Sequence, residues 1–178
     1  MRIISGTHKG RRITPDKKFK ARPTTDFAKE NLFNVINNWY DIDDLDVLDL
    51  FSGTGGISYE FASREAKSII SIEKDFNHQA FIKRTITDLG FKNVKSIKAD
   101  VFKYLKSCKM KFDLIFADPP FALKEIDTIP DAVFEQDLLQ DNGILIVEHS
   151  KETNFSAHPM FTEQRVYGSV NFSIFSKK

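Results

Sequence analysis

The chain has 178 residues and a mass of 20.4 kDa, a length that fits one domain and can bury a core without a disulfide or metal staple. It is 41% hydrophobic and 29% charged, and its apolar runs are short, which argues against disordered, collagen-like and membrane-spanning chains. The net charge is +1 and Cys108 is the single cysteine, so we expect a reduced, cytoplasmic protein with no internal disulfide and no metal site.

Residues 1–22 form a basic segment ahead of the rest of the chain. They carry eight Lys or Arg against one acid, Asp16, for a net charge of +7, so the remaining 156 residues sum to −6. The eight cations are Arg2, Lys9, Arg11, Arg12, Lys17, Lys18, Lys20 and Arg22. Gly6 and Gly10 beside short apolar pairs predict a hairpin or an arm, closed by Pro23. The charge favours a polyanionic partner, and a solvated tail without a partner is the alternative. We therefore expect an arm at 1–22 and a main domain at 23–178.

Helices and strands alternate after this arm. Helical spacing of apolar residues predicts helices at 26–39, around 57–61, up to Gly90, at 102–105 and after Pro130. Strand-like runs are at 45–51, 68–73, 94–99, 112–117, 143–148, 164–168 and 171–175. The runs VLDLF, IISIE, DLIFA and ILIVE are typical of strands buried on both faces. The sequence predicts an α/β fold with a doubly wound, mostly parallel seven-stranded sheet and an antiparallel edge at its C-terminal end.

Two unusual segments follow the first and fourth strands, whose carboxyl ends flank the reversal of strand order where such sheets bind ligands. The first is residues 49–56, which run from Asp49 through Phe51 to the glycines Gly53, Gly55 and Gly56. Glycines in a strand-to-helix turn allow a ligand to approach the backbone closely. Ser58 stands where a dinucleotide motif has its last glycine, which weakens a dinucleotide interpretation.

Acidic residues end the neighbouring strands. Glu73 lies 24 residues after Asp49, at the usual place for an acid that binds ribose hydroxyls. Asp100 can accept a hydrogen bond from an adenine amino group, with the backbone of Val101 beside it. With Asp118 these acids line a crevice that suits a ligand with a positive centre, such as S-adenosylmethionine, better than the pyrophosphate of NAD.

The second segment is Asp118-Pro119-Pro120-Phe121, at the end of the fourth strand. Two prolines remove N–H donors from the turn, so carbonyls and the Asp118 carboxylate can face the crevice as acceptors, and Phe121 offers a ring for stacking. Acceptors that hold the N–H bonds of a flat amine turn its lone pair toward an incoming methyl group. The turn therefore predicts transfer of a methyl group to a planar nitrogen, with Asp118 orienting the amine.

The chain resembles the bacterial 16S ribosomal RNA guanine-N2 methyltransferase family. The resemblance rests on five segments in consistent order: RIISGTHKGRRI (2–13), RPTTDFAKENLFN (22–34), DLFSGTGGISYE (49–60), IEKD (72–75) and FDLIFADPPF (112–121). It implies a Rossmann-like class I methyltransferase whose cofactor is S-adenosylmethionine and whose partner is ribosomal RNA or an assembling small subunit.

The resemblance also implies a role for each site residue. Asp49 and the loop 53–56 would hold the methionine part of the cofactor, Glu73 its ribose and Asp100 its adenine. Residues 118–121 would hold the guanine amino group and base, and the arm would contact RNA. The residues by themselves leave other functions open: methylation of adenine N6, cytosine N4 or a protein glutamine amide, a non-catalytic RNA-binding module, and an NAD-dependent oxidoreductase.

Overall fold

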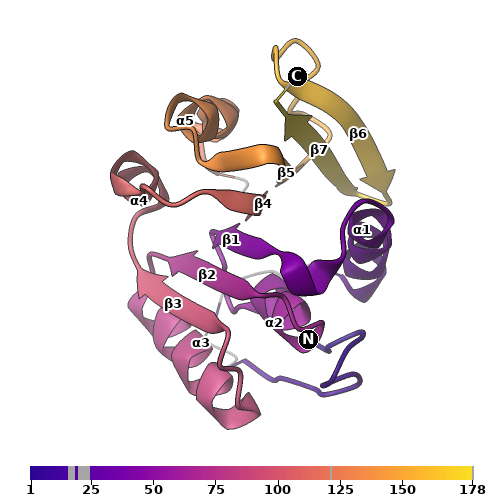
Figure 1. Cartoon of the computed structure of the whole chain (residues 1–178), viewed down its shortest axis with the longest axis vertical. Coiled ribbons are helices and arrows are strands. Elements are labelled where there is room, and N and C mark those ends of the chain that lie inside the picture. The colour runs from indigo at the N-terminus through magenta and orange to yellow at the C-terminus, as the bar shows by residue number, and fades with distance from the viewer. Residues whose placement is uncertain (16–18, 20–24, 121, 178) are drawn as a thin grey trace.

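The computed structural model describes residues 1–15, 19, 25–120 and 122–177, which form a seven-stranded sheet with helices on both faces (Figure 1). The strands are β1 (Asp46–Leu50), β2 (Ser68–Glu73), β3 (Val94–Lys98), β4 (Phe112–Ala117), β5 (Leu139–His149), β6 (Phe161–Tyr167) and β7 (Val170–Ser176). The helices are α1 (Asp26–Trp39), α2 (Gly56–Ser63), α3 (Phe76–Leu89), α4 (Val101–Ser107) and α5 (Ile129–Glu135), with short 3-10 helices η1 (Ile42–Asp44) and η2 (Ile126–Thr128).

The strand order is β3-β2-β1-β4-β5-β7-β6. Strands β1 to β5 run parallel to one another, and β7 is antiparallel to both β5 and β6. This order confirms the predicted doubly wound sheet and its antiparallel C-terminal edge. It also confirms that the direction of winding reverses between β1 and β4.

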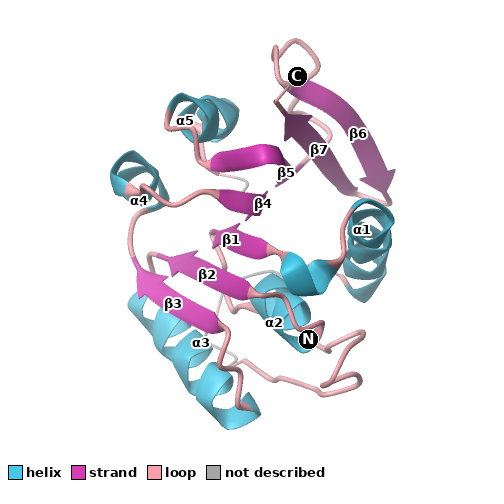
Figure 2. Cartoon of the chain, viewed as in Figure 1, coloured by secondary structure: helices cyan, strands magenta, loops and turns pink. Residues whose placement is uncertain are grey.

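Apolar side chains cover both faces of the sheet, because successive residues of a strand point to opposite sides. Val47 packs in a cluster with residues of α1, α2 and α3, whereas the next residue, Leu48, packs with residues of α4 and α5. Figure 2 shows these helices arranged around the central strands. The helix α3 ends where the sequence predicts, at Gly90, which has a left-handed conformation with φ of 69°.

The strand β5 begins earlier than the sequence predicts. Leu139 already pairs with Phe112, and the next paired residue of β5 is Ile144, opposite Leu114, so residues 140–143 bulge between them. A Cβ on Gly143 would lie 2.9 Å from the carbonyl oxygen of Phe112. The turn-like Asp141-Asn142-Gly143 is therefore a bulge inside the strand, because this glycine allows the two backbones to approach closely.

The first thirteen residues fold into a hairpin. Arg2 and Arg12 form an antiparallel bridge, and the backbone N–H of Ile13 donates to the carbonyl of Met1 at 3.0 Å. Ile3 and Ile13 are buried in the cluster that holds α1 and α2. The structure thus decides for a hairpin over an extended arm. Lys17, Lys18, Lys20, Arg22 and Pro23 lie outside the described residues.

The carboxylate of Glu60, on α2, fixes this hairpin against the body. Glu60 is fully buried, and its two oxygens accept hydrogen bonds from the backbone N–H groups of Ile4 at 2.9 Å and Ser5 at 3.0 Å. Lys29 and Arg64 form ion pairs with the same carboxylate at 3.5 Å and 3.1 Å. A buried charge is tolerated when it is paired and hydrogen-bonded in this way. The hairpin is consequently attached to the helix that begins at the glycine loop.

Candidate cofactor and substrate site

The two segments singled out from the sequence lie side by side. In the register of β1 and β4, Leu50 is the partner of Ala117, and the N–H of Asp118 lies 3.4 Å from the carbonyl oxygen of Leu50. The glycine loop and the proline turn therefore leave the sheet at the same edge, on adjacent strands. This confirms the prediction that the two segments converge at the reversal of strand order, and a ligand crevice between them stays a prediction.

The glycine loop has a backbone that most side chains would strain. Gly53 and Gly55 have φ of 55° and 86°, and Phe51, which is not a glycine, has φ of 58°. The N–H of Gly55 donates a hydrogen bond to the carbonyl of Ser52 at 2.7 Å. A Cβ on Gly55 would lie 2.5 Å from the ring of Tyr59, so a larger residue would not fit there. Strained backbone of this kind is concentrated at ligand sites.

Asp49 lies beneath this loop rather than on its surface. It is 1% exposed, and its Oδ2 accepts a hydrogen bond from the hydroxyl of Ser58, the residue that replaces the last glycine of the dinucleotide motif. Burial raises the pKa of Asp49 to about 7, the nearby Asp118 adds to that rise, and the hydroxyls of Ser58 and Ser52 oppose it. Sequence reasoning missed Ser58 as a partner of Asp49, because no local pattern links the two.

Glu73 joins the end of β2 to the glycine loop. Its Oε2 accepts from the N–H of Gly53 at 2.8 Å, and its Oε1 accepts from the N–H of Asp75 at 2.7 Å. Each carboxylate oxygen can accept a further hydrogen bond, so Glu73 can hold two hydroxyl groups while it keeps these contacts. Its ribose-binding role remains a prediction that this geometry permits.

Asp100 has two local contacts. It caps α4 by accepting from the N–H of Lys103 at 3.2 Å, and it pairs with Lys74 at 3.1 Å. The hydrogen bond from Lys74 lowers the pKa of Asp100, although partial burial opposes the shift. The adjacent Val101 is buried. The predicted contact of Asp100 with adenine therefore has to form beside an existing ion pair.

Phe51, which the sequence placed at the cofactor site, contacts Phe102, which the sequence did not single out. The rings of Phe51 and Phe102 meet edge to face with centroids 6.4 Å apart. Phe102 follows Asp100 and Val101 at the start of α4, and Phe51 opens the glycine loop. The two rings offer apolar surface beside residues predicted to bind the nucleoside, a combination typical of pockets for flat ligands.

Asp118 shares its end of the sheet with a second acid. Ala117 is the register partner of Val147, so Asp118 and Glu148 leave adjacent strands at the same level. Burial and the charge of Glu148 raise the pKa of Asp118 well above its usual value. Sequence reasoning missed Glu148, although it ends the run ILIVE at the same edge at which Glu73 ends IISIE.

The proline turn continues from this acid. Pro119 is buried and Pro120 is exposed, and the carbonyl of Pro120 accepts from the N–H of Leu123 at 2.8 Å. Phe121, the predicted stacking ring, lies outside the described residues.

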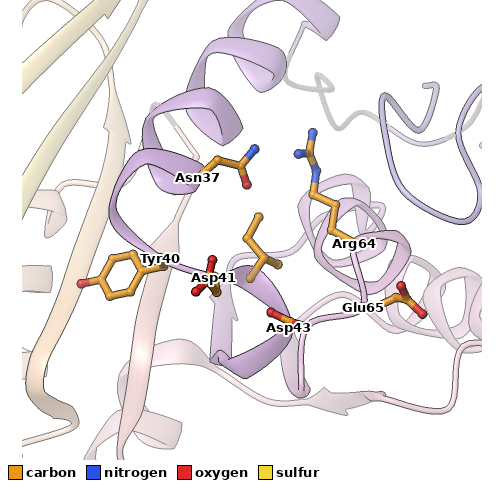
Figure 3. Close-up of a pocket in the computed structure, with 7 residues that line it drawn as sticks. Asn37, Tyr40, Asp41, Asp43, Arg64 and Glu65 are labelled. Atoms are coloured by element: carbon orange, nitrogen blue, oxygen red, sulfur yellow. The ribbon is translucent and has the colours of Figure 1, made fainter.

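A polar pocket of about 410 Å³ lies elsewhere, between the end of α1, η1 and the end of α2 (Figure 3). It is lined by Asn37, Tyr40, Asp41, Ile42, Asp43, Arg64 and Glu65. Since η1 precedes β1, this pocket belongs to the amino edge of the strands, opposite the glycine loop. Arg64 is already bound to Glu60. We assign the pocket no role in the chemistry.

The residues that the structure describes contain no group of three or more His, Cys, Asp or Glu that could hold a metal ion. None of the helices in that same part of the chain is long and apolar enough to cross a membrane.

Four of the predicted RNA-binding cations lie on the docked hairpin. Arg2, Lys9, Arg11 and Arg12 are all exposed, and Arg2 pairs with Asp26 of α1 at 3.2 Å. Because Glu60 anchors the hairpin to α2, the backbone that carries these cations is attached to the helix that begins at the glycine loop. A polyanion bound to them would lie against the same body that holds the crevice.

Comparison with known proteins places this architecture in a family. The family model described as "Conserved hypothetical protein 95" matches residues 1–176. Ribosomal RNA small subunit methyltransferase D of Buchnera aphidicola subsp. Baizongia pistaciae is 33% identical over 154 residues, which cover 86% of this chain and 78% of that protein.

Solved structures share the fold. Hypothetical protein TTHA0928 of Thermus thermophilus superposes with a TM-score of 0.88 at 23% identity, over 99% of each chain. SMU.776, solved in complex with SAH, superposes with a TM-score of 0.61 at 19% identity, over 75% of this chain and 47% of that one. The chain belongs to the Conserved hypothetical protein 95 family, and it is a relative of ribosomal RNA small subunit methyltransferase D.

Proposed function

We propose that this protein transfers the methyl group of S-adenosylmethionine to the exocyclic N2 of a guanine in 16S ribosomal RNA. The observation that carries the proposal is the adjacency of the glycine loop and the proline turn, joined at the 3.4 Å contact between Asp118 N–H and Leu50 O. One segment suits a cofactor and the other suits a flat amine, so their contact brings donor and acceptor together. The name of the 33% identical relative supports ribosomal RNA as the substrate.

The charge of the crevice supports the cofactor. S-adenosylmethionine supplies a methyl group attached to a positively charged sulfur. The carboxyl of Asp49, buried beneath the glycine loop, lies near that of Asp118, and burial raises the pKa of both. A cation bound among such groups stabilises their ionised forms and draws their pKa values down, whereas a pyrophosphate would be repelled. The SAH held by the structurally similar SMU.776 agrees with this choice.

Asp118 has the central role toward the substrate. Its carboxylate, with the carbonyls of the turn, accepts the N–H bonds of the guanine amino group and directs the nitrogen lone pair toward the methyl group. Because its pKa is raised by burial and by Glu148, Asp118 can accept the proton that the methylated nitrogen releases, directly or through water. Phe121 would stack on the base, which is extruded or already exposed in the RNA.

The hairpin would supply the RNA contact. Arg2, Lys9, Arg11 and Arg12 would bind phosphates, and residues 23–178 would form the methyltransferase domain. The remaining predicted cations, Lys17, Lys18, Lys20 and Arg22, would extend this contact. Ribosomal RNA or an assembling small subunit in the cytoplasm is the partner that we propose.

Mass-spectrometric analysis of nucleosides in ribosomal RNA, from cells with and without the gene, tests this function. Loss of N2-methylguanosine, restored by the wild-type gene and not by Asp118→Ala, would support it. Loss of N6-methyladenosine or N4-methylcytidine instead would assign the enzyme to another planar nitrogen. Unchanged nucleosides, together with no heat of S-adenosylmethionine binding in calorimetry, would leave a non-catalytic RNA-binding module.

A further inference from the structure

A second basic segment lies outside the hairpin. Residues 92–111 contain seven lysines and one acid, Asp100, for a net charge of +6. Because the whole chain carries +1 and residues 1–22 carry +7, the remaining residues sum to −12. The protein thus gathers its positive charge in two segments and leaves the rest of its sequence acidic.

Six of these lysines are exposed and form no ion pair with another residue that the structure describes. We name them the lysine strip: Lys92, Lys95, Lys98, Lys103, Lys106 and Lys109. The seventh lysine, Lys111, forms an ion pair with Asp137 at 2.5 Å. The one acid of the segment, Asp100, forms an ion pair with Lys74 at 3.1 Å. Lys98 and Lys103 lie near enough to Asp75 and Asp100 to help lower the pKa of those carboxyls, but no lysine of the strip is held in an ion pair within the described structure.

The fold places these lysines on two consecutive elements. β3 is the edge strand of the sheet, and α4, which follows it directly, lies beside α5 on one face of the sheet (Figure 1). Lys98 is the last residue of β3 and Lys103 lies in the first turn of α4, so both lie at the edge where the parallel strands end, near the proposed crevice. Lys95 and Lys106 lie toward the opposite edge of the sheet. At that opposite end the strip approaches the hairpin, because the ring of Phe91, next to Lys92, meets the ring of His8 with centroids 4.6 Å apart.

Protection of the sheet edge explains only part of this pattern. Lysines on an edge strand discourage pairing with another chain, which accounts for Lys95 and Lys98. Lys103 and Lys106 lie on α4, which has no open edge to protect. Within 92–111, Met110 is the large apolar side chain that is exposed, at 49%. A surface rich in cations and poor in apolar groups fits a polyanion better than it fits a protein partner.

We infer that the lysine strip binds the phosphate backbone of the same RNA whose base enters the crevice. The inference rests on the proposed function for the identity of the RNA. The hairpin meets the start of the strip where His8 contacts Phe91, next to Lys92, and the strip continues along β3 and then on α4. An RNA that lies along this surface would reach the crevice at its carboxyl end, where Lys98 and Lys103 lie.

The test is the salt dependence of binding to 16S ribosomal RNA transcribed in vitro, measured on the full chain. The strip variant is Lys95→Gln/Lys106→Gln/Lys109→Gln, which avoids the lysines nearest the crevice. The control variant, Lys67→Gln/Lys151→Gln/Lys177→Gln, makes the same change of charge on other parts of the surface. Thermal melting verifies that both variants fold. Binding weakens as salt rises, and each lost phosphate contact makes the negative slope of log K against log salt shallower by about 0.7 to 0.9. We therefore expect the slope of the strip variant to be shallower than that of the wild type by about 2, and the slope of the control to be almost unchanged.

Methyl transfer gives a second measurement. We expect the strip variant to raise KM for RNA and to leave kcat unchanged, because its lysines contact neither cofactor nor target base. A slope equal to that of the wild type, or an equal loss in both variants, would overturn the inference. Equally tight, strip-dependent binding of polyglutamate would also overturn it, since the surface would then accept any polyanion. The binding titration needs no turnover, so it remains decisive if the proposed reaction proves wrong.

Discussion

Asp118 is an acid whose surroundings oppose its ionisation. Burial and the neighbouring Glu148 both raise its pKa, and the prolines that follow it cannot donate hydrogen bonds. An acid with a raised pKa in a crevice, beside acceptor groups, is a typical arrangement for handling an amine proton. In the proposed reaction, Asp118 would act through both its geometry and its charge.

Replacement of Asp118 separates these two contributions. Asp118→Ala removes one transition-state acceptor, so we expect a loss of about 3 kcal/mol, or at least a hundredfold in rate. Asp118→Asn keeps a carbonyl acceptor and should lose less. Single-turnover methyl transfer measures both rates, with Asp127→Asn on exposed η2 as the control. Near wild-type turnover of Asp118→Ala with intact cofactor affinity would remove Asp118 from the reaction.

Asp49 makes the ligand-free protein sensitive to pH. Its folded-state pKa of about 7 exceeds the ordinary value of 3.8, so between these values the folded state binds more protons than the unfolded state. Stability should therefore decrease as pH rises toward 7, by at most about 4 kcal/mol from this group. Melting of the wild type and Asp49→Asn across this range checks the expectation. Parallel pH profiles for the two proteins would contradict it.

At the scale of elements, the hairpin and α2 depend on close backbone contact. The N–H of Thr7 donates to the carbonyl of Ser63 at 2.7 Å, and a Cβ on Gly6 would overlap that same oxygen. Gly6 is therefore required by contact as well as by its φ of 81°. The hairpin that carries the basic residues can therefore approach α2 this closely because residue 6 is a glycine.

Gly10 provides a matched control for this contact. It has φ of 82°, and a Cβ there would meet nothing within 4 Å. We expect Gly10→Ala to cost about 1 to 2 kcal/mol from the left-handed backbone alone. Gly6→Ala should cost clearly more, because Ser63 must move and the Thr7 hydrogen bond is lost. Urea unfolding measures both, and equal losses would show that the close approach is unimportant.

Over the whole molecule, positive charge is concentrated where the chain would meet RNA. Residues 1–22 carry +7 on a body that is negative, and the described part of this segment is docked on α2, the helix that begins at the glycine loop. Arg11→Gln/Arg12→Gln should lower the slope of log K against log salt for 16S ribosomal RNA by about 1.5. Filter binding over a salt series measures it, with Lys67→Gln/Lys151→Gln as the control. An unchanged slope would remove the hairpin from the RNA interface.

The sequence by itself determined the order and kind of the main elements and the edge of the sheet at which the glycine loop and the proline turn meet. Buried parallel strands require apolar runs, and glycines and prolines act on the backbone locally, so VLDLF, Gly90 and Asp118-Pro119-Pro120 could be interpreted without coordinates. Only the tertiary structure decided the contacts that join distant segments. Ser58 on Asp49, Glu148 beside Asp118, and Glu60 beneath the hairpin depend on register and on side-chain direction. No local pattern encodes these distances, because they are set by the packing of strands and helices that lie far apart along the chain.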